Sequence, residues 1–366
     1  MRVAVIGHGR MGYHHAGVLT QLAGVELVAV AEPDRVRREA AASRWGTRVY
    51  EDFHDMLKNE HPDAVTVATP DTAHVEPVLA ALAAGCHVFV EKPLARTEAD
   101  ARRLAEAAGA AGRQVMVSHL LRFDPRYARA KEMLRQGKVG ELLAAHAFHN
   151  VITTPWTAAR SNIEFNVSIH MLDLIGWLAN RPIRSVYASK AEHRIPRLEG
   201  VQGGPGSVVG ETGQVDLIGS IAALVELEGG ILASLHNAWS TWRYFPGNIQ
   251  SRLEVIGTRG ALQVEAVEPA VTVYAGGEAA YPDWAYWPEI EGRFVGALRE
   301  ALAAFVESVG SGRRVPVTAE EGMAAVVAAA ALQSSAQSGT RVYLADASGA
   351  GRMASGSAHM ASGSVR

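Results

Sequence analysis

The feature that most constrains the fold is an alternation of short apolar runs with helical stretches in the first third of the chain. The runs are continuous in Val, Ile and Ala instead of alternating with polar residues, as is typical of parallel strands covered on both faces. This β-α series predicts a doubly wound α/β domain with a parallel sheet. The strand-like runs are 2–7, 26–32, 64–70, 87–91 and 114–118, and the helical stretches are 11–23, 33–45, 72–85 and 97–112.

The turn after the first run carries the glycine pattern G-x-G-x-x-G, at residues 7–12. It follows a predicted strand, opens a helix and has an acidic residue, Glu32, at the end of the next strand, which together predict a Rossmann dinucleotide-binding site. The glycines allow a tight turn and close approach to a pyrophosphate, and Glu32 would accept hydrogen bonds from the adenosine ribose. A carboxylate there favours NAD. NADP stays open as the second choice because three arginines follow, namely Arg35, Arg37 and Arg38.

The pattern changes after residue 122. Consecutive strand-like segments are joined by GG or TRG turns, which predicts hairpins and a mostly antiparallel sheet. The predicted units are a Rossmann domain at 1–122, an α+β substrate-binding and oligomerisation domain at 123–345, and a tail at 346–366 that is disordered or added by cloning. Within the second unit we expect helices at 127–136, 163–179, 292–309 and 319–337, a strand at 141–150 and a flexible loop at 199–214.

Composition excludes several function classes. The chain has 366 residues and a formal net charge of −3, so it has no basic field for binding nucleic acid. Cys86 is the only cysteine, which fits a reducing compartment. We expect no signal peptide, because the sequence opens directly into a predicted strand. The longest apolar run, 323–332, is too short to span a bilayer. We expect a cytoplasmic protein with neither a nucleic-acid nor a membrane partner.

A charged pair in front of a proline ends the fourth predicted strand. Ligands of doubly wound sheets bind beyond the carboxyl ends of the strands, and Glu91-Lys92-Pro93 stands at such an end, as do Thr69 and Pro70. Lysine is rare in this chain, so its presence in the cleft indicates that the Lys92 amine has a function. Burial would lower the pKa of this amine. The alternative is a structural ion pair between Glu91 and Lys92. The proline fixes the following backbone, and a cis peptide is one way to do so.

These motifs resemble those of the Gfo/Idh/MocA oxidoreductases, which include inositol dehydrogenases and glucose–fructose oxidoreductase. The resemblance extends to about residue 344 and includes VIGHGRMGYHHAGVL, AVAEPD, TVATPDTAHVEPVLAALAAGCHVFVEKPLA, RFDP, IHMLDLIGWL, LEVIGTRGAL and VTAEEGMAAVVAAAALQSSAQSG. It implies nicotinamide-dependent hydride transfer at a ring carbon of a sugar or cyclitol, with Lys92 touching the reacting hydroxyl. The cofactor-binding residues so predicted are Gly7, His8, Gly9, Arg10, Met11, Gly12, Glu32, Thr69, Pro70, His74, Glu91 and Lys92.

The apolar helix at 163–179 supplies the second catalytic candidate. Asn166, His170 and Asp173 share one face at helical spacing. A lone buried histidine is more often a core residue, but the resemblance places His170 on the family's catalytic histidine and Asp173 on a substrate-binding carboxylate. We expect His170 to be the general base with an ordinary pKa, Lys92 to stabilise the alkoxide, and Lys92, Asn166, His170 and Asp173 to bind substrate. Asn166 departs from the family, which usually has a carboxylate there, so a charged partner for His170 is in doubt.

Other features are less specific. Sugar stacking is as well supported as packing in the core or at a subunit interface for Trp156, Trp239, Trp242 and the run 281–289. Packing is favoured over a metal site for His14, His15, His146 and His149, which lack converging carboxylates or thiolates. Two alternative functions stay open, an NADPH-linked keto-sugar reductase and a non-catalytic dinucleotide-binding regulator. By analogy with the family, we expect a homodimer or homotetramer.

Overall fold

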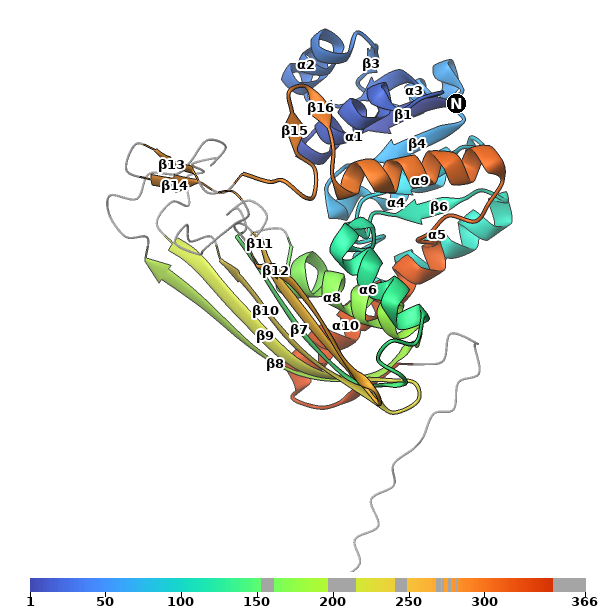
Figure 1. Cartoon of the computed structure of the whole chain (residues 1–366). Coiled ribbons are helices and arrows are strands. Elements are labelled where there is room, and N and C mark those ends of the chain that lie inside the picture. Colours follow the sequence, from blue (N-terminus) through green and yellow to red (C-terminus); the bar gives the residue numbers. More distant parts are fainter. Residues whose placement is uncertain are drawn as a thin grey trace, which may run out of the picture.

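The computed structural model describes residues 1–152, 161–196, 215–240, 249–267, 271, 273–275, 278–280 and 282–344. These residues form two large sheets, each with its own helices (Figure 1). After the second sheet the chain returns to the first, and its last described strand again belongs to the second. The predicted loop at 199–214, the tail at 346–366, Trp156 and Trp242 lie outside the described residues.

The first sheet confirms the predicted doubly wound architecture. Its six strands are all parallel and have the order β3-β2-β1-β4-β5-β6. Because the strand order reverses between β1 and β4, a ligand crevice is expected at their carboxyl ends. The strands are β1 (Arg2–Ile6), β2 (Glu26–Ala31), β3 (Arg48–Tyr50), β4 (Ala64–Val67), β5 (His87–Val90) and β6 (Val115–Val117).

Helices cover this sheet and begin where the sequence provides caps. Asp34, Asp52 and Thr97 each accept a backbone N–H with their side chains at the start of a helix. Strand β3 and helix α3 were not predicted, because β3 has three residues and little apolar character. The helices are α1 (Arg10–Gln21), α2 (Arg35–Trp45), α3 (Phe53–Glu60), η1 (Asp71–Ala73), α4 (Val75–Ala83), α5 (Glu98–Ala111) and η2 (Leu120–Phe123).

The second sheet is mostly antiparallel, as predicted. Its seven strands have the order β12-β11-β7-β10-β9-β8-β17, and β7 pairs in parallel with β10. Two small hairpins, β13–β14 and β15–β16, follow β12. The strands are β7 (Leu142–Ile152), β8 (Ile183–Pro196), β9 (Val215–Leu227), β10 (Ile231–Ser240), β11 (Ile249–Gly257), β12 (Gly260–Val267), β13 (Val273–Ala275), β14 (Glu278–Ala280), β15 (Glu289–Ile290), β16 (Arg293–Phe294) and β17 (Val342–Tyr343).

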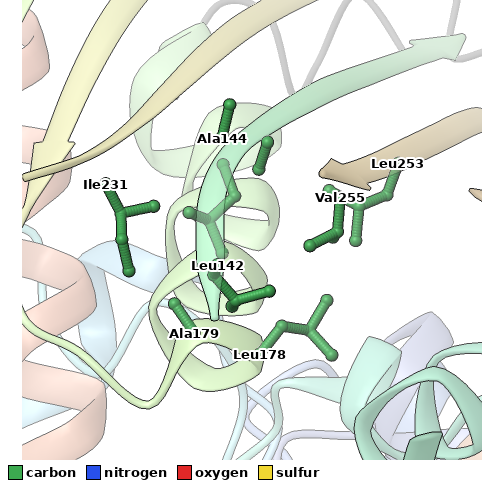
Figure 2. Close-up of a pocket in the computed structure, with 9 residues that line it drawn as sticks. Leu142, Ala144, Leu178, Ala179, Ile231, Leu253 and Val255 are labelled. Carbon is green, nitrogen blue, oxygen red and sulfur yellow. The ribbon is translucent and has the colours of Figure 1, made fainter. Parts of the chain in front are cut away.

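One face of the second sheet packs against helices α8 and α10. Alternate residues of the strands point to this face, as Ala145, Ala147 and His149 of β7 do, and they are buried. Between α8 and the sheet remains an apolar void of about 10 Å³ (Figure 2), too small and too apolar for a polar ligand. The helices are α6 (Pro125–Arg135), the π-helical turn η3 (Glu164–Ser168), α8 (Ile169–Ala179), α9 (Ala297–Ser311) and α10 (Ala319–Ser338).

The chain from 282 to 296, here called the strap, leads from the second sheet back to the first domain. Tyr13 of α1 donates its hydroxyl to Glu289 (2.8 Å), and Gln21 bonds the backbone at both Gly292 and Phe294. Helix α9 then packs against α1 and β5, and the N–H of Val117 donates to the carbonyl of Val317 beyond it. The predicted helix at 292–309 therefore starts later, at Ala297, because the β15–β16 hairpin precedes it.

Truncating Leu253, which lines the void in Figure 2, tests the packing of the second domain. Leu253→Ala enlarges an existing void, so we expect it to lower the free energy of unfolding by about 2–5 kcal/mol. Urea unfolding followed by circular dichroism measures this. The control is Val36→Ala, because Val36 is 70% exposed, and it should change the value by no more than about 0.5 kcal/mol. Equal effects of the two variants would contradict the packing described here.

Candidate active site

The glycine loop lies at the carboxyl end of β1, where the strand order reverses. Gly7 has a φ of +88°, and a Cβ on Gly12 would lie 1.9 Å from the Gly7 carbonyl oxygen, so both positions require glycine. Helix α1 has neither a capping side chain nor an acidic residue in its first turn. Its first backbone N–H groups are therefore free to bind an anion, and the loop fits the pyrophosphate of a dinucleotide.

Glu32 holds this loop in place. One carboxylate oxygen accepts the N–H of His8 (2.6 Å) and the other accepts the N–H of Asp34 (3.0 Å). Trp45 donates its indole N–H to Nε2 of His8 at 2.9 Å, and burial lowers the pKa of His8. The Glu32 carboxylate thus supports the loop backbone, while its oxygens keep further lone pairs for ribose hydroxyls.

Two of the arginines that left NADP open have partners within the protein. Arg38 donates to the carbonyl groups of Glu32 and Pro33, and Arg35 pairs with Glu39. The guanidinium groups of both arginines are thus bonded to other groups of the protein. This agrees with the preference for NAD predicted from Glu32.

The loop after β4 is fixed by a buried histidine. The ring of His74 lies between two carbonyl oxygens, with Nδ1 at 2.7 Å from that of Pro93 and Nε2 at 3.1 Å from that of Thr69. Thr69 donates its hydroxyl to the carbonyl of Ala73, and Pro70 is exposed beside it. His74 therefore joins the loop after β4 to the Lys92–Pro93 segment after β5, and burial lowers its pKa.

Lys92 extends from the end of β5 to the second domain. Its Nζ donates to the backbone carbonyl of Asn166 at 2.9 Å, and the Lys92–Pro93 peptide bond is cis. Burial lowers the pKa of Lys92, and Arg10 adds to this, whereas Glu91 and Asp71 oppose it. The ammonium of Lys92 therefore reaches the helix that carries His170.

His170 follows the segment of Asn166 in the chain and lies at the start of α8. Its pKa lies well below the ordinary value because the ring is buried. The positive charge of Lys92 lowers the pKa further, and electrostatic repulsion from His149 and His119 acts in the same direction. The expectation of an ordinary pKa was wrong. Asn166 brings no negative charge to oppose the shift, and it lies in the π-helical turn η3, so it is not one regular α-turn from His170. Such π-turns are frequent at functional sites.

Asp173 forms a buried ion pair. Arg122 donates Nε (2.9 Å) and Nη2 (2.6 Å) to the two oxygens of Asp173, and its Nη1 donates to Glu321 at 2.8 Å. The Asp173 side chain is 3% exposed. The structure thus brings Lys92, Asn166 and His170 together, while it places the Asp173 carboxylate in a bidentate pair with Arg122 that was not predicted.

Two further histidines lie at this site, and the sequence interpretation missed both. The ring of His149 on β7 is 5.6 Å from that of His170, and burial lowers the pKa of His149 to about 3. His119 follows β6, is buried and lies 3.7 Å from Asp173. The sequence contains an indication of both. His119 follows the end of a strand, as Lys92 does, and His149 stands at one of the alternate positions of β7 that point toward the helices.

The tryptophans divide between core and surface. Trp239 is 2% exposed and belongs to the core, whereas the strap carries Trp284 under Arg126 and Trp287 under Arg10 as cation–π contacts. Among the described residues, no three His, Cys, Asp or Glu side chains are arranged to hold a metal ion. Within the same residues, no helix is long and apolar enough to cross a membrane.

A parallel sheet with an anion-binding glycine loop, facing a second domain that supplies polar groups to the same cleft, is the design of the two-domain dinucleotide-dependent oxidoreductases. The family model for the oxidoreductase family with an NAD-binding Rossmann fold matches residues 1–119, and the model for the GFO/IDH/MocA C-terminal domain matches residues 127–263. The chain belongs to the Gfo/Idh/MocA oxidoreductase family.

Individual relatives agree with this assignment. The chain is 31% identical over 345 residues to an inositol 2-dehydrogenase of Acidothermus cellulolyticus, covering 93% of this chain and 94% of the relative. It is similar to the crystal structure of scyllo-inositol dehydrogenase from Lactobacillus casei with bound NAD(H) and scyllo-inositol, at 26% identity and a TM-score of 0.73, over 94% of this chain and 98% of that one. It also resembles GenD2 from gentamicin A biosynthesis in complex with NAD, at 25% identity and a TM-score of 0.76, over 94% of this chain and 96% of that one.

Replacing Asp173 tests whether its carboxylate is structural. Asp173→Asn leaves Arg122 without its bidentate partner in a buried site, so we expect the free energy of unfolding to fall by about 3–5 kcal/mol. Urea unfolding measures it. As a control, Glu39→Gln removes an exposed pair with Arg35 and should change the value by about 1 kcal/mol or less. A stable Asp173→Asn protein with only a raised KM would instead favour the predicted role in substrate binding.

Proposed function

We propose that this oxidoreductase uses NAD to oxidise a secondary alcohol on the ring of a cyclitol, with inositols as the first candidates. The inositol 2-dehydrogenase of Acidothermus cellulolyticus aligns with nearly the whole chain, and the similar structure from Lactobacillus casei contains NAD(H) together with scyllo-inositol. The observation that carries the proposal is the reach of Lys92 to the helix of His170. A cytoplasmic location is part of the proposal, since the single cysteine, Cys86, is a buried free thiol.

The two polar groups would act on the same hydroxyl. NAD, when bound, supplies the hydride acceptor. His170, whose low pKa keeps it neutral at physiological pH, would accept the hydroxyl proton. The Lys92 ammonium would donate a hydrogen bond to the oxygen as negative charge develops on it. A weakly basic His170 without a neighbouring carboxylate makes the Lys92 charge the more important of the two.

Substituting these residues tests the proposed roles. With NAD and a panel of inositols and sugars, followed by absorbance of the reduced cofactor, we expect Lys92→Met to lower kcat by roughly 10²–10³-fold. His170→Gln should lower it less, by about 10²-fold, the lower end of the range for a general base. Lys138→Met is the matched control, because Lys138 is exposed in a turn, and it should retain wild-type turnover.

The same experiment separates the alternatives. NAD should raise the melting temperature of the wild type and of both active-site variants, because a bound ligand stabilises the folded state. Strong cofactor binding with no turnover of any substrate in either direction would favour a non-catalytic regulator. Stronger protection by NADP than by NAD would favour the keto-sugar reductase.

We further propose that the chain self-associates through the face of the second sheet that lies opposite α8 and α10. Large apolar side chains are exposed there on neighbouring strands, with Leu224 at 56%, Leu232 at 58% and Tyr187 at 44%. The ring of His236 stacks on Phe148 of the adjacent strand, with 5.9 Å between centroids. An exposed apolar patch of this kind is typical of a protein–protein interface, and a second copy of the chain offers a matching surface.

Charging this face tests the assembly. We expect light scattering after size exclusion to give the mass of a dimer or tetramer for the wild type. The double variant Leu224→Glu with Leu232→Glu should give the monomer mass, because two carboxylates per chain would have to be buried in the interface. Val36→Glu changes an exposed residue of α2 and should keep the wild-type mass. A monomeric wild type would contradict the proposal.

A further inference from the structure

A buried histidine on the cofactor-binding helix contacts the residue next to Lys92. Nε2 of His15, on α1, lies 3.0 Å from Oε1 of Glu91, and the hydroxyl of Ser118 donates to the same oxygen at 3.0 Å. An ionised carboxylate only accepts hydrogen bonds, so His15 must carry its proton on Nε2. His15 is fully buried, and its ring meets Phe89 of β5 edge to face at 5.4 Å. The donor is therefore held in one orientation.

This contact has an electrostatic consequence. Burial alone would raise the pKa of Glu91, but the hydrogen bond and charge of His15, the charge of Lys92 and the hydrogen bond of Ser118 together lower it. The ionised Glu91 in turn supports the charge of Lys92 against burial.

Other charged and titratable groups also face Lys92 and His15. Asp71 supports the Lys92 charge from the loop after β4, and Arg10 opposes it from α1. His119, His149 and His170 are the other groups near Lys92, and their own pKa values are lowered by its charge. His14 is the neighbour of His15 on the same helix. Of the two carboxylates that support the Lys92 charge, Glu91 and Asp71, Glu91 is the one bonded to a buried histidine. Removing that histidine would therefore change the charge of Glu91.

We propose that His15 is a positioning residue that keeps Glu91 ionised and thereby keeps the ammonium of Lys92 charged in the cleft. The loss of the Nε2 donor would leave a buried carboxylate with one neutral donor, so the pKa of Glu91 would rise. Lys92 would then lose support from the neighbouring carboxylate that most opposes the effect of burial, and it would release its own proton at lower pH. The effect on turnover depends on the proposed function, whereas the effect on the charge of Lys92 does not.

The charge of Lys92 can be measured without substrate. The chain has five lysines, Lys58, Lys92, Lys131, Lys138 and Lys190, so peptide mass spectrometry can follow the acetylation rate of each one against pH. In His15→Leu we expect the midpoint of the Lys92 curve to fall by about one pH unit, the lower end of the shift caused by an adjacent opposite charge. His15→Gln keeps an N–H donor and should restore most of the midpoint. His14→Leu, the matched control on the same helix, should leave it unchanged.

A second variant keeps the test decisive if His15→Leu fails to fold. Glu91→Gln removes the carboxylate charge directly and should lower the Lys92 midpoint by a similar amount. Adding His15→Gln or His15→Leu to Glu91→Gln should produce no further shift, because the two residues act through one charge. In the active enzyme, the alkaline limb of the kcat/KM profile should move down in pH together with the Lys92 midpoint.

The outcomes are distinct. An unchanged Lys92 midpoint in folded His15→Leu, or in Glu91→Gln, would overturn the inference. A shifted midpoint in a protein that turns over no substrate would leave the inference standing and would contradict only the proposed function.

Discussion

The order of the strands in the first sheet determines where the groups that the first domain gives to the site lie. Because β1 and β4 are neighbours and all six strands are parallel, the loops after β1, β4, β5 and β6 emerge at one edge. Those loops carry, in turn, the glycine pattern, Thr69, Lys92 and His119. Hydrogen bonds then join the loops to one another, with His74 bridging the second and third and Glu91 accepting from Ser118 near the fourth.

The cleft is rich in buried cations and imidazoles and poor in compensating acids. Arg122 is neutralised by Asp173 and Glu321, and Lys92 has Glu91 beside it. Among the described residues, no acid is hydrogen-bonded to His119, His149 or His170. Only His119 has a carboxylate nearby, that of Asp173 at 3.7 Å, and burial lowers the pKa of all three histidines. A group that brings negative charge into this space is therefore favoured, which agrees with chemistry in which an alkoxide develops. The asparagine at 166 contributes to this balance, because a carboxylate there would place an additional negative charge beside Lys92.

Most of the fold and part of the site could be read from the sequence, since both follow from local patterns. Continuous apolar runs predicted the parallel sheet, and the glycine spacing with Glu32 predicted the cofactor loop. What could not be read was long-range pairing. The bond of Asp173 to Arg122 joins residues 51 positions apart, and the contact of Lys92 with Asn166 is 74 positions apart. The π-turn at 164–168 was also missed, because ordinary helical spacing describes the sequence equally well. The pKa of His170 likewise depends on groups far away in the sequence, namely Lys92, His119 and His149.

The backbone bond between Val117 and Val317 has a consequence for how the molecule can be divided. Val317 lies along the outer strand of the first sheet, and Phe305 of α9 packs on Phe89 of β5 at 5.7 Å. A piece of the gene cut at the end of the amino-terminal unit would encode a sheet with a bare edge and an uncovered aromatic ring. Exchange of cofactor modules between such enzymes therefore needs two crossover points, one near residue 122 and one ahead of the strap, so that both separated segments travel together.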